Sequence, residues 1–186
     1  MSAAAGPVVL LDRDGVLNVD RPAGVHGLDE LALEAGAAEG VALLARAGFT
    51  CLVVTNQALV GRGELSPAGL EAIHAELARR VAAGGGRIAA WYACTHRAED
   101  GCACRKPLPG LLERAQREWG FAPARTWFVG DAERDVAAAR AAGCRPALVA
   151  TGKGAASARA LPEVPLFPDL PAFARALIGA ALETPA

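Results

Sequence analysis

The sequence lacks a surplus of charge of either sign, since 19 basic residues stand against 20 acidic ones and the net charge is -1. A general electrostatic attraction to nucleic acid or to an anionic membrane is therefore excluded, and any anion must be bound by local groups. No apolar run approaches the length that a membrane-spanning helix needs. The first residues, MSAAAGPVVLLDRDG, also lack the basic start and the long apolar stretch of an export signal. We expect a cytoplasmic protein with neither a membrane nor a nucleic-acid partner.

Disulfide bonds are not expected either. The chain has five cysteines in 186 residues, and without an export signal these are expected to be reduced thiols or metal ligands. Hydrophobic residues make up 53% of the sequence and charged ones 21%, which supplies enough apolar surface for a buried core. The length is that of one ordinary domain, and we expect residues 1–186 to form it.

Short apolar runs alternate with helical segments along the chain. Val8–Leu11 and Thr50–Val54 are typical of buried strands, and the segment between them, from Gly36 to Ala47, is helical by composition. Ser66-Pro67 is a helix start, and that helix continues to the glycines at 84–86. Further elements are predicted as strand 88–94, helix 109–119, strand 126–129, a helix to 142, a last strand near 147–150, a loose segment 152–168 and a closing helix at about 169–182.

This alternation predicts an α/β fold with a Rossmann-like parallel sheet and helices on both faces. Ligands of such sheets collect at the carboxyl ends of the strands. Four polar groups follow predicted strands in this sequence, namely Asp12 with Asp14, Thr55-Asn56, Arg105-Lys106, and Asp131 with Asp135. Each alone is compatible with an ordinary role, such as a solvated turn, an exposed basic pair or favourable charge at a helix start. Their arrival in this order at strand ends makes coincidence improbable.

These four motifs resemble those of the haloacid dehalogenase-like superfamily, and among its members the sequence is most similar to the heptose bisphosphate phosphatases and the related histidinol phosphatases. The resemblance implies a magnesium-dependent phosphomonoesterase that works through a phosphoaspartyl intermediate. A phosphate monoester repels a carboxylate nucleophile, so a metal ion and a lysine must screen both charges.

The resemblance also implies a role for each motif residue. Asp12 is expected to attack phosphorus, Asp14 to exchange protons with the leaving group and with water, and Thr55 and Lys106 to hold the transferred phosphoryl group. The expected Mg2+ ligands are Asp12, the backbone carbonyl of Asp14 and Asp131, with Asp135 in support. Asn56 and Arg105 are expected substrate contacts. Arg62 is a candidate contact for a second phosphate, and a solvated loop arginine is the alternative.

The substrate predicted from the resemblance is D-glycero-D-manno-heptose 1,7-bisphosphate, from which the 7-phosphate is removed. The sequence departs from the heptose phosphatase pattern at Ala132 and at Ala58-Leu59, so histidinol phosphate and other small monoesters stay open. The intervals between the motifs are too short for the large cap domain that many superfamily members carry. A catalytically silent relative that only binds a phosphorylated ligand is a further alternative.

A second metal site is predicted next to the lysine motif. Cys94, His96, Cys102 and Cys104 provide three sulfurs and one imidazole within eleven residues. A Cys3His set suits tetrahedral Zn2+ with no open position, which is typical of a structural site. Heptose bisphosphate phosphatases resemble this loop, at about 94–104, as well. A zinc-ribbon-like nucleic-acid module is the competing interpretation, but it leaves the aspartates without a role.

Overall fold

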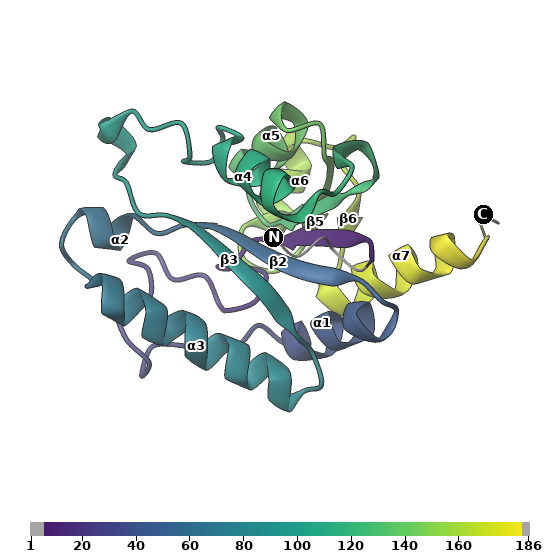
Figure 1. Cartoon of the computed structure of the whole chain (residues 1–186), viewed down its shortest axis with the longest axis horizontal. Helices are drawn as coiled ribbons and strands as arrows, with labels where there is room; N and C mark the ends of the chain where they lie inside the picture. The colour runs from purple at the N-terminus through teal and green to yellow at the C-terminus, as the bar shows by residue number, and fades with distance from the viewer. Residues whose placement is uncertain (1–5, 184–186) are drawn as a thin grey trace.

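The computed structural model describes residues 6–183 of the chain, and its centre is a parallel sheet (Figure 1). Six strands lie in the order β3-β2-β1-β4-β5-β6, and every neighbouring pair is parallel. The strands are β1 (Val8–Leu11), β2 (Thr50–Asn56), β3 (Ile88–Cys94), β4 (Trp127–Gly130), β5 (Arg145–Val149) and β6 (Leu166–Phe167).

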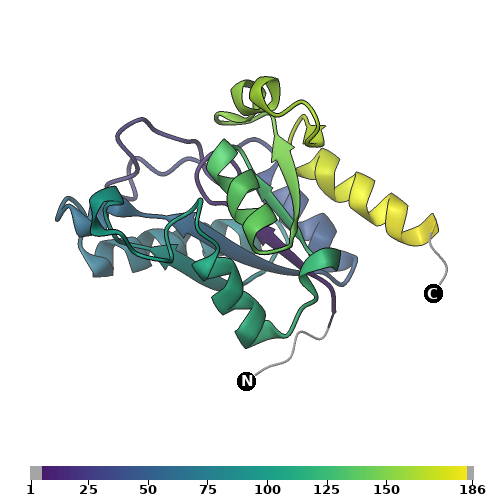
Figure 2. The same cartoon turned by 90° about the horizontal axis from the view of Figure 1, so that it is seen from above.

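Helices cover both faces of the sheet (Figures 1 and 2). One face carries α1 (Ala37–Arg46), α3 (Pro67–Ala83) and α7 (Leu170–Glu183), and the other carries α4 (Gly110–Trp119), α5 (Glu133–Ala141) and α6 (Gly154–Ala160). The single-turn helix α2 (Ala58–Gly61) follows β2 directly. The prediction of an α/β fold with a parallel sheet between two helix layers is confirmed.

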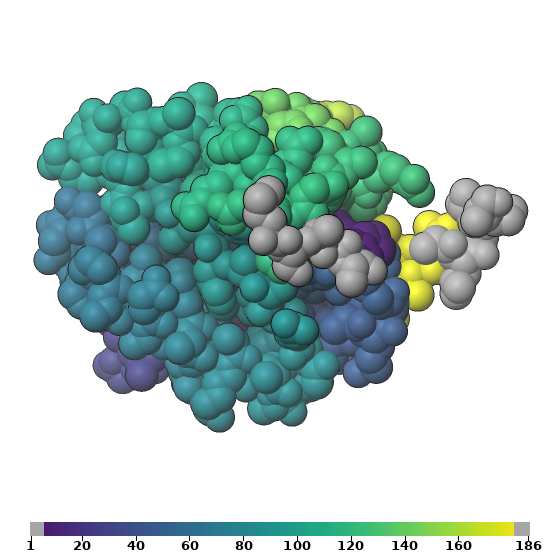
Figure 3. Space-filling view, in the orientation of Figure 1, coloured from purple at the N-terminus to yellow at the C-terminus, as the bar shows by residue number. Residues whose placement is uncertain are grey.

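The central strand β1 shows why an unbroken apolar run forms this sheet. Successive side chains of a strand point to opposite faces. Val9 and Leu11 pack into the core beneath α1 and α7, whereas Val8 and Leu10 pack into the core beneath α4 and α5. Because both faces are covered, all of β1 is buried, and little of it shows in the space-filling view (Figure 3). The side chains on both faces of β1 must therefore be apolar.

The predicted elements differ from the structure chiefly at the C-terminal side. β5 is not the last strand, because the segment 152–168 that was expected to be loose contains α6 and the two-residue strand β6. The helix start at Ser66 is confirmed, since its hydroxyl accepts a hydrogen bond from Gly69 N at 3.0 Å. β2 continues past the predicted end, so Thr55 and Asn56 belong to the strand.

The segments that follow β1 and β2 contain no inserted domain. After β1 the chain makes only isolated bridges, from Asn18 to Asp14 and Leu33, before α1 begins. Between β2 and β3 lie only α2 and α3. This agrees with the expected absence of a large cap. Among residues 6–183, no helix is both long and apolar enough to cross a bilayer.

Candidate active site

Asp12 and Lys106 form a buried ion pair at the carboxyl edge of the sheet. Asp12 follows β1, and its backbone N–H still donates to Val129 O of β4 at 2.9 Å. Lys106 Nζ lies 2.8 Å from Asp12 Oδ1 and 2.7 Å from Asp135 Oδ1, and it donates to Val54 O at 2.9 Å. These contacts use all three protons of the ammonium group. The lysine is therefore fixed between the two carboxylates.

Three carboxylates gather around this lysine. Oxygen atoms of Asp12, Asp131 and Asp135 all lie within 4.8 Å of one another, and all three residues are buried. Burial, with the neighbouring Asp135 carboxylate, raises the pKa of Asp12 to about 7 even though Lys106 opposes the shift. Burial raises the pKa of Asp131 to about 6. The three carboxylates thus carry more negative charge than Lys106 and the nearby Arg134 can offset, and a further cation suits the cluster.

The carboxylate of Asp131 is held in a tight cradle. Its Oδ2 accepts a hydrogen bond from Lys153 N at 2.8 Å, whereas its buried Oδ1 has no hydrogen-bond partner among residues 6–183. A Cβ atom at Gly15 or at Gly152 would come within 2.2 Å of Oδ2. Both glycines also have positive φ, of 81° and 55°. The backbone on either side therefore leaves room for this carboxylate only because these two positions lack side chains.

Asp14 lines the cavity, where several donors hold its carboxylate. Arg13 Nη2 and Asn18 Nδ2 donate to its Oδ1 at 2.8 and 2.9 Å, and Gln57 Nε2 donates to its Oδ2 at 2.8 Å. Although burial acts in the opposite direction, these partners, Arg13 foremost, hold the pKa of Asp14 below its usual value. Asp14 is thus an oriented carboxylate that borders the open space of the site.

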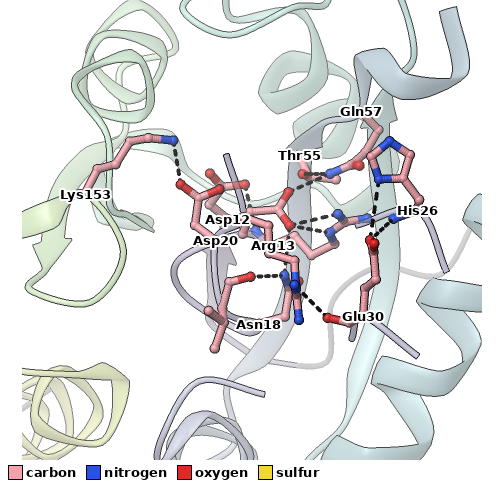
Figure 4. A network of polar contacts seen from close by, with 12 residues as sticks. Asp12, Arg13, Asn18, Asp20, His26, Glu30, Thr55, Gln57 and Lys153 are labelled. Atoms are coloured by element: carbon pink, nitrogen blue, oxygen red, sulfur yellow. Dashed lines mark hydrogen bonds and ion pairs between the residues drawn. The ribbon is translucent and has the colours of Figure 1, made fainter. Parts of the chain in front are cut away.

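Thr55 lies at the bottom of the same site, with 1% of its surface exposed. Its Oγ1 accepts a hydrogen bond from Gln57 Nε2 at 2.8 Å, as Figure 4 shows. Because a hydroxyl carries one proton of its own, this contact leaves the Thr55 O–H free to donate. Gln57 therefore joins Thr55 to Asp14 and orients both.

The side-chain amide of Asn56 forms two hydrogen bonds with the backbone of Lys106. Its Nδ2 donates to Lys106 O at 3.0 Å, and its Oδ1 accepts from Lys106 N at 3.1 Å. These two bonds pair the amide with a segment fifty residues further along the chain. Asn56 borders the cavity, as expected for a substrate contact, but its side-chain hydrogen bonds go to Lys106.

The cavity above Asp14 has a volume of about 170 Å3 and is rich in cationic side chains. Arg62 and Arg105, both expected substrate contacts, are among the residues that line it. Arg62 Nε pairs with Glu64 Oε1 at 2.6 Å. Lys153 Nζ reaches across to Asp20 Oδ2 at 2.5 Å (Figure 4). Arg62 and Arg105 thus line the same cavity, together with Lys153, which was not among the expected contacts.

The four predicted zinc ligands converge. Cys104 Sγ lies 3.3 Å from Cys94 Sγ, 3.5 Å from Cys102 Sγ and 3.3 Å from His96 Nδ1. Cys94 Sγ lies 3.6 Å from both Cys102 Sγ and His96 Nδ1. Separations of this size are close to the edges of a tetrahedron with metal–ligand bonds of roughly 2.0–2.3 Å. The cluster can therefore hold a zinc ion, directly before Arg105 and Lys106 in the chain.

Three residues around the site, Arg13, Gln57 and Arg134, were not predicted from the sequence to belong to it. Arg13 lies between the two motif aspartates, yet its guanidinium is fully buried against Asp14. Gln57 follows Thr55-Asn56, and its position beside a polar strand end was the one available hint. Arg134 lines the cavity from the first turn of α5, and a charged residue there is ordinary in sequence. Only the fold shows what these residues contact.

Comparisons with known proteins agree with this geometry. The family described as HAD-hydrolase-like matches residues 103–172. The D-glycero-beta-D-manno-heptose-1,7-bisphosphate 7-phosphatase of Pseudomonas aeruginosa is 44% identical over 173 residues, which cover 92% of this chain and 97% of that protein. The crystal structure of D,D-heptose 1,7-bisphosphate phosphatase from B. bronchiseptica, complexed with magnesium and phosphate, has a TM-score of 0.89 and 38% identity, and covers 94% of this chain and 99% of that one.

A histidine-pathway protein is also similar. The histidine biosynthesis bifunctional protein HisB of Legionella pneumophila is 33% identical over 130 residues. These residues cover 69% of this chain but 37% of that protein. The likeness is therefore to a part of the bifunctional protein.

Proposed function

Since the chain belongs to the haloacid dehalogenase-like phosphatases, in the family of the D-glycero-beta-D-manno-heptose-1,7-bisphosphate 7-phosphatases, we propose that it removes the 7-phosphate from D-glycero-D-manno-heptose 1,7-bisphosphate. The observation that carries the chemistry is the buried pair of Asp12 and Lys106 with two further carboxylates beside it. The similarity to relatives of that name over nearly their whole length supports the substrate.

The carboxylate cluster fits a magnesium ion. All its donors are oxygen atoms, which Mg2+ prefers, and Asp131 Oδ1 is buried without a partner among the described residues. We propose Asp12, the backbone carbonyl of Asp14 and Asp131 as ligands, with Asp135 in support through Lys106. The ion would neutralise charge on the transferred phosphoryl group and favour the ionised form of Asp12.

Asp12 is placed to act as the nucleophile. In the first half of the reaction its carboxylate attacks phosphorus, the bond from phosphorus to the sugar oxygen breaks, and Asp14 gives that oxygen a proton. In the second half, water attacks phosphorus and gives a proton to Asp14, the bond from phosphorus to the Asp12 oxygen breaks, and inorganic phosphate leaves with the Asp12 carboxylate restored. Lys106 offsets charge in both halves, and Thr55 donates its free proton to a phosphoryl oxygen.

The hydrogen bonds of Asp14 suit the second half directly, because there it must be an ionised acceptor. For the first half it must carry a proton. A dianionic phosphate that enters beside it adds negative charge, which raises the affinity of a carboxylate for a proton. Gln57 and Asn18 meanwhile hold its orientation.

The zinc cluster is proposed as a scaffold for the segment that carries Arg105 and Lys106. We expect about one zinc ion per chain by elemental analysis of the purified protein, since the four ligands fill a closed tetrahedral site. Cys104→Ser is expected to lower the zinc content and the melting temperature, because one of the four ligands is lost. Cys144→Ala is the control, since Cys144 is a buried free thiol that does not belong to the group of four possible ligands. Absence of zinc with an unchanged melting temperature would contradict the assignment.

The substrate is tested by a panel of phosphorylated metabolites ranked by kcat/KM in the presence of Mg2+. We expect heptose 1,7-bisphosphate to rank above histidinol phosphate and above p-nitrophenyl phosphate. A higher rank for histidinol phosphate would favour the alternative, which the partial likeness to HisB supports. Loss of the 1-phosphate in place of the 7-phosphate, seen by phosphorus NMR of the product, would refute the proposed position of cleavage.

We propose one catalytic domain, because the described residues build a single sheet. A small phosphorylated sugar is the proposed partner, with neither nucleic acid nor a membrane. A cytoplasmic location is supported by the five cysteines, all of which are free thiols that could persist or bind metal in a reducing compartment.

A further inference from the structure

The opening of the cavity has more cationic groups than the reacting phosphoryl group requires. Two of its lining residues are acidic, Asp14 and Asp20, whereas the basic ones are Arg21, Arg62, Arg105, Arg134 and Lys153. Asp12, Thr55 and Lys106 lie buried below this opening, with at most 2% of their surface exposed. The opening therefore holds positive charge in addition to that of the buried Lys106.

Most of these cations already have partners. Arg62 pairs with Glu64 and Lys153 with Asp20. Arg21 Nε donates to Glu30 O at 2.8 Å. Arg134 forms no ion pair within residues 6–183, and its buried Nε has no hydrogen-bond partner there. Although burial acts in the opposite direction, the nearby carboxylates of Asp12 and Asp135 raise the pKa of its guanidinium without bonding to it. An unpaired guanidinium at a cavity wall is an available site for an anion.

The position of Arg134 has no evident structural benefit. It lies in the first turn of α5, where the N-terminal end of the helix dipole disfavours a positive charge. The side chain is only partly buried, and its guanidinium forms no ion pair within residues 6–183, although the carboxylates of the site favour its charged form. Asp135 beside it contacts Lys106 instead. A ligand oxygen in the cavity would give the buried Nε of Arg134 the hydrogen-bond partner that it lacks among residues 6–183.

We propose that Arg134 binds the phosphate that stays on the product, and so makes the site selective for a sugar that carries two phosphates. This rests on the proposed function, which places the other phosphate at Asp12. Arg105 lines the same cavity, and the side-chain hydrogen bond that it forms within residues 6–183, from Nη1 to His96 O at 3.4 Å, is long. The two guanidinium groups together offer planar, bidentate donors that match phosphate oxygens.

The test compares substrates that differ in the second phosphate. For Arg134→Gln we expect kcat/KM with heptose 1,7-bisphosphate to fall roughly 10- to 100-fold, mainly through KM, since a charge-assisted hydrogen bond is lost. With p-nitrophenyl phosphate, which has no second phosphate, kcat/KM is expected to stay within about twofold. Arg134→Lys should restore part of the loss, because charge returns without the bidentate geometry.

Arg140→Gln is the matched control, because Arg140 lies on the same helix and pairs at the surface with Glu163, away from the cavity. It should leave both activities as they are. An equal loss of both activities in Arg134→Gln would overturn the proposal and assign the residue to the reacting phosphoryl group. No loss with either substrate would also overturn it.

A second measurement separates this inference from the proposed substrate. Fructose 1,6-bisphosphate and fructose 6-phosphate are compared as competitive inhibitors of p-nitrophenyl phosphate hydrolysis. We expect the bisphosphate to bind more tightly to the unmodified enzyme, and Arg134→Gln to remove that advantage. If heptose 1,7-bisphosphate is a poor substrate but this pattern holds, the proposed substrate fails and the role of Arg134 stands. If the variant keeps the advantage, the role of Arg134 fails.

Discussion

Asp12→Asn is expected to reduce phosphatase activity by roughly 10^4-fold or more, because loss of a covalent nucleophile has effects of this order or larger. The amide has the shape of the carboxylate but cannot attack phosphorus. Mg2+-dependent hydrolysis of p-nitrophenyl phosphate and of heptose 1,7-bisphosphate should both disappear, since both share the step at Asp12. A variant that keeps substantial activity with either substrate would contradict the role of Asp12.

The same variant is expected to fold normally. Burial and Asp135 raise the pKa of Asp12 to about 7, so its ionised form does not stabilise the folded protein when no metal ion is present. In the variant, Lys106 also keeps Asp135 as its ion-pair partner. Circular dichroism and a thermal melt without Mg2+ should match those of the unmodified protein. Loss of activity can then be read as loss of chemistry.

Trapping the intermediate completes the test of Asp12. Asp14→Asn removes the group that accepts a proton from water. With p-nitrophenyl phosphate, whose leaving group needs no proton, Asp12 can still be phosphorylated, and the phosphoaspartyl enzyme is therefore expected to accumulate. After acid quenching, the peptide that contains Asp12 should carry the mass of a phosphoryl group, and hydroxylamine should remove it. No adduct should form when Asp12→Asn is combined with Asp14→Asn. A phosphoryl group found on another residue would refute the assignment.

Much of the site could be predicted because parallel strands leave a clear sequence signal. β1 is buried on both faces and is therefore an unbroken apolar run in the sequence, so the sequence shows that the strand ends before Asp12. Because ligands of parallel sheets collect at the carboxyl ends of the strands, Asp12 after β1 and Asp131 after β4 could be placed at one edge of the sheet. The zinc ligands were visible from residue type and spacing, since three cysteines and a histidine this close together are typical of a structural zinc site.

The segment after β5 could not be predicted, because its structure depends on contacts made across the fold. α6 is a short helix, rich in small residues, and too short to show a helical period. Ser157 Oγ donates to Asp131 O at 2.8 Å, which ties the helix to the active-site strand. A Cβ atom at Gly154 would overlap Val149 O. Such close packing has no signature in the local sequence.

The positioning residues were missed for a similar reason. An Asp-Arg-Asp sequence usually forms a solvated turn, whereas here the Arg13 side chain is completely buried against Asp14. Asn56 was expected to contact substrate, yet its amide pairs with the backbone of Lys106, fifty residues away. Residue type indicated that these groups belong to the site, but their partners are fixed by the topology of the sheet.

Lys106→Met is expected to lower kcat/KM by at least roughly 10^3-fold and to destabilise the fold. Methionine fills a similar volume, so the change removes mainly the charge that faces Asp12 and Asp135. Loss of one partner of a buried ion pair costs about 3–5 kcal/mol in the free energy of unfolding. Added Mg2+ should recover part of that stability, because it binds the carboxylates of the folded protein. It should not recover the activity, because the negative charge on the transferred phosphoryl group no longer has the Lys106 ammonium beside it.

The other lysine of the chain provides the control for stability. Lys153 is about half exposed, and its side chain pairs with Asp20 at the surface. Lys153→Met should therefore change the free energy of unfolding by less than about 1 kcal/mol. Urea denaturation of both variants, with and without Mg2+, measures the difference. If Lys106→Met were as stable as Lys153→Met and kept Mg2+-dependent turnover within tenfold of the unmodified enzyme, the carboxylates would have to be balanced by other groups, and Lys106 would lose the central place that its three short contacts give it.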